Sequence, residues 1–401
     1  MRLIAASFLV LVAACDMRVT NPGPVSDDAL NDPAAHQAVV NGMARALAKA
    51  VGYLAYTGGI VTKEIVSAGL RNTTTLGVSI KQASGKLDPA LEENNDHWKF
   101  AQQARWVAED GVRRIREAQG AAFATSVIGA QGLVYVGFAN RLLGENMCDA
   151  VFDGGPKEPR SKYFERAEAA FGEAIAIAVA ANDANVAAAA RAGRASVRAS
   201  LGNWSGAASD AGQIATAFSY RLVYSSTEPE LFNRIFQANV NSARAHSVFG
   251  TFFESYYAST NDPRTPWKTN PALPTGLAGV PWLFQTKFAS TGSPINLVTG
   301  REMKLVVAES LLRSGDWPGA LAAINALRSS SGVTPATAAN AATTWTALAR
   351  ERGIELWLEG RRLGDIARWE ASGAPLVFDE MAGRDRCFPI GVSEVDANPN
   401  F

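Results

Sequence analysis

Apolar residues recur along much of this chain with the spacing expected of helices. Over residues 163–178 they fall at i, i+4, i+7 and i+8, which places them on one helical face. Residues 187–208 are rich in alanine, which has the highest helix propensity. Residues 350–369 form a third amphipathic run, with Trp357 and Trp369 on its apolar face. We therefore expect an all-α fold.

A six-residue motif occurs twice, each time between two helical runs. Gly-Asn-Trp-Ser-Gly-Ala spans residues 202–207, and Gly-Asp-Trp-Pro-Gly-Ala spans residues 315–320. The first glycine accepts a positive φ in a tight turn, and the final alanine lets the two helices cross closely. A helix, such a turn, an aromatic residue and an alanine are typical of tetratricopeptide hairpins. We expect tetratricopeptide-like helical-hairpin repeats.

The region between these motifs has a different composition. Residues 251–299 contain six prolines and many glycine, serine, threonine and asparagine residues. Repeated proline excludes long helices, and long loops on a rigid scaffold are where binding sites tend to lie. We predict an irregular loop region over about 251–299. A second loop is predicted over 69–96.

The first residues have the pattern of a secretory signal. Arg2 precedes an apolar run over residues 3–12, which is too short to span a bilayer as a mature helix. The run ends in Val-Ala-Ala-Cys, and small residues before a cysteine resemble a bacterial lipobox. We predict a signal peptide at 1–14, a lipid on Cys15, a tether at 15–32 and a single helical domain at 33–401. A plain signal peptide with an incidental cysteine is the alternative.

Composition and charge exclude several functional classes. The 401 residues include 38 basic and 38 acidic side chains, so the chain has no electrostatic footprint for nucleic acid. The three histidines stand in unrelated contexts without metal-ligand spacing, so we expect no metal. The sequence contains no nucleophile elbow, His-Glu-x-x-His motif, phosphate loop or credible triad. We expect no catalytic residues and no cofactor.

Two cysteines remain besides Cys15. In an oxidising envelope compartment Cys148 and Cys387 can form a disulfide, or both can stay as buried free thiols. The separation of their Cα atoms decides between these alternatives and cannot be inferred from the sequence. Both alternatives therefore stand.

A stripe of charged residues follows the predicted helix over 350–369. Arg352, Glu355, Glu359 and Arg362 are spaced by three, four and three residues. Glu355 and Glu359 can be imagined as a pair of catalytic carboxylates. We favour an i,i+3/i+4 ion-pair ladder along the helix.

Motifs in this same segment resemble a known family. Glu-Arg-Gly-Ile-Glu-Leu at 351–356, Glu-Gly-Arg-Arg at 359–362 and Asp-Ile-Ala-Arg-Trp at 365–369 resemble the C-terminal signature of the SusD/RagB family. Asn-Asp-Pro-Arg at 261–264 resembles its Asp-Pro-Arg element, and residues 301–310 resemble its repeat helix. The closing segment 386–401 and the start at Cys15 also agree. Residues 144–148 depart from the family's usual Gly-Asp-(Val/Ile)-Pro turn.

The resemblance implies an outer-membrane lipoprotein of a Gram-negative bacterium, held at the cell surface by its N-terminal lipid. Such a protein captures a nutrient, here expected to be an oligosaccharide, and delivers it to a TonB-dependent, SusC-like barrel. The family is not expected to be enzymatic. A tetratricopeptide-type envelope scaffold that binds only other proteins is a rival hypothesis, and a lipoprotein glycosidase is another.

Candidate ligand-binding residues follow from the chemistry of sugars. Exposed aromatic faces stack on the apolar face of a pyranose, while polar groups bind its hydroxyls. The candidates are Trp267, Trp282, Tyr256 and Tyr257 in the loop region, with Trp98, Arg71 and Asn72 as the opposite wall. Trp204, Trp317, Trp357 and Trp369 lie on repeat or helix faces and are assigned to the core.

Overall fold

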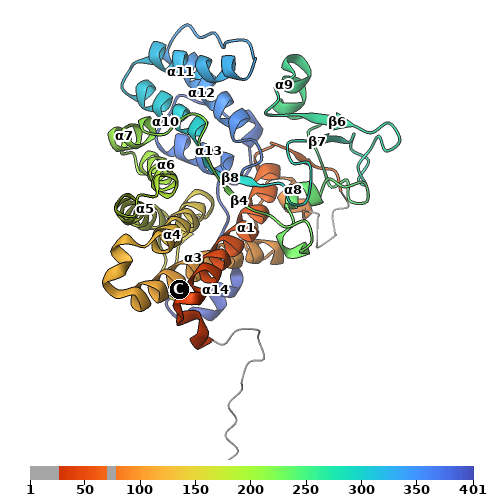
Figure 1. The fold of residues 1–401 in the computed structure, drawn as a ribbon. Helices are drawn as coiled ribbons and strands as arrows, with labels where there is room; N and C mark the ends of the chain where they lie inside the picture. The colour runs from red at the N-terminus through yellow and green to blue at the C-terminus, as the bar shows by residue number, and fades with distance from the viewer. Residues whose placement is uncertain (1–26, 70–77) are drawn as a thin grey trace, which may run out of the picture.

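The computed structural model describes residues 27–69 and 78–401 and is mostly helical, as the hydrophobic pattern predicts (Figure 1). The predictions for Cys15, Arg71 and Asn72 fall outside the described residues. The α-helices are α1 (His36–Val61), α2 (Ile80–Ala83), α3 (Glu92–Gln119), α4 (Val127–Asn146), α5 (Ser161–Ala180), α6 (Ala184–Ser200), α7 (Trp204–Gly212), α8 (Arg234–Gln237), α9 (Phe252–Thr260), α10 (Gly300–Arg313), α11 (Trp317–Ser330), α12 (Ala341–Glu355), α13 (Arg362–Ala371) and α14 (Val392–Ala397). The 3₁₀ helices are η1 (Asp27–Asn31), η2 (Pro33–Ala35), η3 (Gly120–Thr125), η4 (Pro229–Leu231) and η5 (Asp379–Met381).

The described strands are short and pair antiparallel in twos. They are β1 (Val66–Ser67) with β5 (His246–Ser247), β2 (Asp149–Ala150) with β3 (Glu158–Pro159), β4 (Ser219–Leu222) with β8 (Ile295–Thr299), and β6 (Trp267–Thr269) with β7 (Leu283–Gln285). The β4–β8 pair has a register shift between Tyr220 and Arg221. These strands tie loops to the helices and do not form a separate layer.

Successive helices pack side by side in a curved stack (Figure 1). Helices α3 to α7 follow one another in the stack, α7 packs on α10, and α10 continues it through α11 and α12. The main hydrophobic core lies between α1 and α3 to α7, and a smaller core joins α10 to α13. Leu305, Ile324, Leu348 and Trp369 are among the buried side chains of the smaller core.

The two sequence motifs form two similar turns, which confirms the predicted hairpins. Gly202, between α6 and α7, has φ +80°, and Gly315, between α10 and α11, has φ +90°. Asn203 Oδ1 accepts a hydrogen bond of 3.0 Å from the backbone of Gly206, and Asp316 caps α11 in the same way. Such a side-chain cap satisfies an N–H that the first helical turn leaves free.

Of the tryptophans assigned to the core, Trp357 and Trp369 are fully buried. Trp204 and Trp317 are only partly buried. The Arg313 guanidinium lies 4.3 Å from the centre of the Trp204 ring and covers part of it. Trp204 therefore lies at the edge of the stack, next to charged side chains.

The prediction of one continuous helix over residues 350–369 is wrong. Helix α12 ends at Glu355, and α13 begins at Arg362. Between them Leu358 has φ +60° and Gly360 has φ +73°. Leu358 keeps this conformation because its N–H donates a 2.9 Å hydrogen bond to the buried Glu64 carboxylate.

The charged stripe on this segment is accordingly not an ion-pair ladder along one helix. Each member pairs with a residue from a different part of the chain, so the stripe cross-links elements. The pairs are Arg352 with Asp365 (2.9 Å), Glu355 with Arg264 (2.9 Å) and Arg301 (2.7 Å), Glu359 with Lys287 (2.9 Å), and Arg362 with Glu380 (2.7 Å).

The predicted loop region over 251–299 contains one regular helix, α9. Its prolines begin at Pro263, so nothing in Phe252–Thr260 opposes helix formation. Asn261 ends α9 in the left-handed conformation, with φ +53°. The rest of the region holds β6, β7 and β8, and α9 with β6 and β7 projects from the side of the stack (Figure 1).

No single helix in the described ranges is both long and apolar enough to cross a membrane. One pair bent by 111°, Asn94–Thr125 with Val127–Asn146, meets that test jointly by length and composition.

Cys148 and Cys387 form a disulfide, which settles the alternative left open above. Their Cα atoms are 5.0 Å apart and their sequence separation is 239 residues. The bond joins the segment after α4 to the closing segment. Cys148 N–H also donates a 2.9 Å hydrogen bond to the Phe388 carbonyl.

Replacing Cys148 and Cys387 together by serine should lower the free energy of unfolding by about 2–5 kcal/mol, because the unfolded chain loses a very long-range constraint. Urea unfolding without reductant measures this difference. Wild type in reducing agent serves as the control and should unfold near the midpoint of the variant. Equal stability of variant and oxidised wild type would show that the bond does not stabilise the fold.

Glu64 should make stability depend on pH. Burial raises its pKa to about 7 from the ordinary 4.5, although the Leu358 N–H and the charge of Arg362 act to lower it. The folded chain therefore holds a proton that the unfolded chain releases, and this contribution is lost as pH rises from about 4.5 through about 7. Glu64→Gln keeps the acceptor without the charge. Its stability relative to wild type should rise by about 3 kcal/mol between pH 4.5 and pH 8.

Urea unfolding of both proteins at several pH values measures the difference. Glu230→Gln is the matched control, because its side chain is 74% exposed and its stability difference should not change with pH. A constant difference between Glu64→Gln and wild type would contradict the assignment of the titration to Glu64.

Candidate functional site

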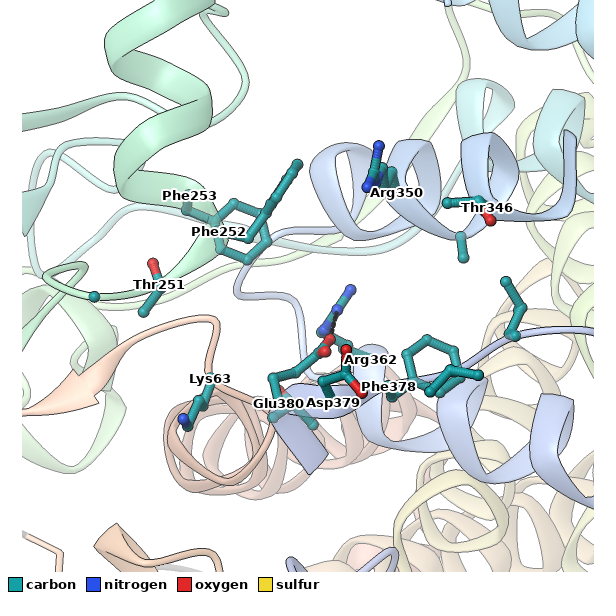
Figure 2. A pocket seen from close by; sticks show the side chains of 15 residues that line it. Lys63, Thr251, Phe252, Phe253, Thr346, Arg350, Arg362, Phe378, Asp379 and Glu380 are labelled. Carbon is teal, nitrogen blue, oxygen red and sulfur yellow. Dashed lines mark hydrogen bonds and ion pairs between the residues drawn. The ribbon is translucent and has the colours of Figure 1, made fainter. Parts of the chain in front are cut away.

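A cavity of about 340 Å³ lies between the start of α9, α12 and the segment around η5. Its walls come from the end of α1 and from residues 250–253, α12 and 376–380. Figure 2 shows Thr251 and Phe252 on one side, Thr346 and Arg350 on the α12 side, and Phe378 across the space. Three regions that are distant in sequence therefore meet around this cavity.

The apolar part of the cavity wall is an aromatic stack on α9. The Phe252 ring is 40% exposed and stacks on Tyr256, with ring centres 5.2 Å apart and planes at 18°. Its neighbour Phe253 points inward and stacks on the buried Trp357 at 5.3 Å. The inward ring anchors the helix, so the outward ring is held in place at the cavity.

A charged hub fixes the other end of the same helix. Tyr256 Oη donates a 2.6 Å hydrogen bond to Oδ2 of Asp262, which is completely buried. The Arg264 guanidinium binds both carboxylate oxygens of Asp262, at 3.0 and 2.7 Å. It also pairs with Glu351 and Glu355 of α12. The Asp-Pro-Arg element thus couples α9 rigidly to α12.

The pKa shifts at the hub agree with this arrangement. Burial and then the hydrogen bond to Asp262 raise the pKa of Tyr256 to about 12, so the phenol stays protonated and keeps donating. Burial also acts to raise the pKa of Asp262, but hydrogen bonds from Arg264 and Tyr256 outweigh it and lower that pKa. Asp262 is therefore ionised and accepts hydrogen bonds from Tyr256 and Arg264 at neutral pH.

The polar part of the cavity carries charges of both signs. Arg362 pairs with Glu380 at 2.7 Å, while Lys63 and Arg350 contribute two further cations and Asp379 another carboxylate. The described residues contain no group of three or more His, Cys, Asp or Glu side chains that could hold a metal. The wall combines an aromatic face with hydrogen-bonding groups, an arrangement that suits binding of a polar organic ligand.

Two of the predicted ligand-binding residues are buried and cannot contact a ligand. Trp282 is 1% exposed and packs on Phe284 with ring centres 4.6 Å apart. Trp98 is 2% exposed, lies in the main core and donates a long hydrogen bond to Glu394 of α14. Neither ring can stack on a ligand in this structure, so the expectation that they are exposed is wrong.

The other predicted aromatic residues lie on or beside α9. Tyr256 belongs to the aromatic stack described above. Tyr257 and Trp267 are half-buried and touch edge to face at 5.7 Å, and Trp267 Nε1 donates to the Glu254 carbonyl. Sequence reasoning missed Phe252, whose position one turn before Tyr256 on a helix was the available signal.

The comparisons with known proteins that found a match all indicate a SusD-like protein. Residues 301–400 match the model of the SusD family. No curated protein matches the chain. Several solved structures share the fold of most of the chain. A laminarin binding SusD-like protein is 14% identical, with a TM-score of 0.66, and the match covers 92% of this chain and 100% of that one.

Two structures from Bacteroides vulgatus ATCC 8482 agree with it. A SusD superfamily protein is 14% identical with a TM-score of 0.67, over 92% of this chain and 99% of its own. A SusD-like carbohydrate binding protein is 17% identical with a TM-score of 0.62, over 84% and 83%. At these identities the solved structures establish the fold, and the family model matches the segment that carries the signature motifs. Residues 301–400 thus match the SusD family, and the chain as a whole has a SusD-like fold.

Proposed function

We propose that this protein is an outer-membrane lipoprotein of a Gram-negative bacterium, anchored by a lipid on Cys15. It captures a nutrient, an oligosaccharide, and delivers it to a TonB-dependent SusC-like transporter. The match of residues 301–400 to the SusD family and the lipobox-like residues before Cys15 support this proposal. Two proteins of the same fold are described as carbohydrate binding and laminarin binding.

The aromatic cavity beside α9 is the proposed ligand site. Phe252 offers an exposed ring for the apolar face of a sugar, and Lys63, Arg350 and Asp379 supply donors and acceptors for hydroxyls. Its volume of about 340 Å³ falls within the range of small-molecule sites. The half-buried Tyr257 and Trp267, which touch each other edge to face, are further candidates for contact with a longer ligand.

The rigidity of this surface is the observation that carries the proposal. Phe252 stacks on Tyr256, Tyr256 is hydrogen-bonded to Asp262, and Asp262 is bound by Arg264. A surface that is already ordered loses little conformational entropy when a ligand binds, so more of the contact energy appears as affinity. Packing of α9 alone would not require an exposed ring fixed in this way.

Phe252→Ala should weaken glycan binding about three- to tenfold, because one stacking face is lost while the fold is kept. Laminarin is the first probe, followed by a panel of glycans, and isothermal titration calorimetry gives the affinity. The thermal midpoint should change little, since Phe252 is exposed.

Trp106→Ala is the matched control, because Trp106 is an aromatic residue of α3 that is 55% exposed and does not line the cavity. It should bind as the wild type does. If Phe252→Ala keeps full affinity for a glycan that the wild type binds, the ligand site lies elsewhere on the protein.

A detergent pull-down of the tagged protein from its native outer membrane, with mass spectrometry of the bound proteins, tests the proposed partner. A TonB-dependent barrel in near-stoichiometric amount is the expected result. Its absence after mild cross-linking would remove the transporter from the proposal. Recovery of a different protein without any bound glycan would favour the scaffold hypothesis.

A further inference from the structure

The centre of the helical stack holds a closed cluster of charges away from the α9 cavity. Four carboxylates and five guanidinium groups pair only with one another in the described ion pairs. The carboxylates are Glu145, Glu302, Glu309 and Asp365, and the arginines are Arg141, Arg313, Arg352, Arg361 and Arg368. The cluster therefore carries one positive charge in excess when every member is ionised.

Asp365 and Arg141 of this cluster are ionised at neutral pH. Burial acts to raise the pKa of Asp365, but the charges of Arg352 and Arg368 lower it to about 2. Burial and then the charge of Arg361 lower the pKa of Arg141 to about 10, so its guanidinium stays protonated. Nε and Nη1 of Arg141 are buried and have no hydrogen-bond partner among the described residues.

A cavity of about 280 Å³ opens next to this cluster. Its lining includes Trp204, Arg160, Arg313 and Arg368. Glu145, Gly364 and Arg368 line both this cavity and a much smaller gap of about 10 Å³ inside the cluster, so the two spaces are neighbours. We call the larger space the arginine cavity.

Arg160 adds a second uncompensated positive charge at the arginine cavity. It immediately precedes α5, and within the described part of the chain its guanidinium has no hydrogen bond or ion pair. Burial lowers its pKa, and Asp149, the acidic group that acts on it, is held by Lys157 at 2.9 Å. A half-buried arginine without a partner is costly unless something else supplies the negative charge.

The arginine cavity offers almost no negative charge of its own. Glu145 is the one carboxylate in its lining, and Oε1 of this residue already accepts a 2.9 Å hydrogen bond from Arg361. Arg313 and Arg368 both form ion pairs with Glu309, which does not itself line the cavity. The lining also includes the Trp204 indole and three hydroxyl-bearing residues, Ser161, Ser200 and Ser372.

We propose that the arginine cavity is a second ligand site that takes a carboxylate-bearing sugar, a uronate. A guanidinium group binds a carboxylate through two parallel hydrogen bonds, and Arg160 is available for this contact. Arg313 and Arg368 already lie over part of the Trp204 ring, and the serine hydroxyls suit the hydroxyl groups of the sugar. The volume fits a single sugar unit. The arginine cavity and the α9 cavity share no lining residue, so this site does not depend on the function proposed for the latter.

Isothermal titration calorimetry of the full-length protein with glucuronate at constant ionic strength tests the proposal. Glucose is the matched neutral probe and should bind at least tenfold more weakly than glucuronate. Arg160→Gln should weaken glucuronate binding at least tenfold. Since Arg160 touches no described protein group by hydrogen bond or ion pair, the thermal midpoint should not fall.

Arg221→Gln is the control, because Arg221 is exposed on β4 and lies outside both cavities. It should bind glucuronate as the wild type does. Equal affinity for glucuronate and glucose would overturn the proposal. So would full glucuronate affinity in Arg160→Gln, or binding of inorganic sulfate without binding of glucuronate.

Discussion

Arg361 is buried between carboxylates of two different helices, and the arrangement of the stack depends on that contact. Its guanidinium lies 2.9 Å from Glu145 of α4 and 2.9 Å from Glu302 of α10. A buried ion pair adds little net stability, but removing one partner leaves an uncompensated charge that costs about 3–5 kcal/mol. The pairing therefore discriminates against any packing in which α4, α10 and the start of α13 do not meet at one point.

Helix α12 links this buried cluster to the proposed ligand surface. Arg352 reaches Asp365 in the cluster, while Glu351 and Glu355 reach Arg264, which holds Asp262 below the aromatic stack of α9. These contacts come from neighbouring turns of a single helix. The position of Phe252 is thus set by the same rigid element that is clamped in the middle of the stack, although α9 itself lies in a region rich in proline.

The helical architecture could be predicted from the sequence because the residues that determine each helix and turn lie close together along the chain. The Gly-Asn-Trp and Gly-Asp-Trp turns need a positive φ and a side-chain cap, and both requirements are met by residues within four positions. The break after Glu355 could not be predicted, because a leucine in the left-handed conformation is held there by Glu64, almost three hundred residues away in sequence. The same holds for the burial of Trp98 and Trp282, since a tryptophan has the same local signature whether a distant segment covers it or not.

The disulfide makes most of the protein a closed covalent ring. Cys148 and Cys387 enclose α5 to α13, including both hairpin turns and the proline-rich region around α9. A protease that cuts one exposed bond anywhere in this ring opens it without releasing a fragment, and the packed stack still holds the two new ends near their original places. A single nick would then not separate the aromatic surface from the rest of the molecule.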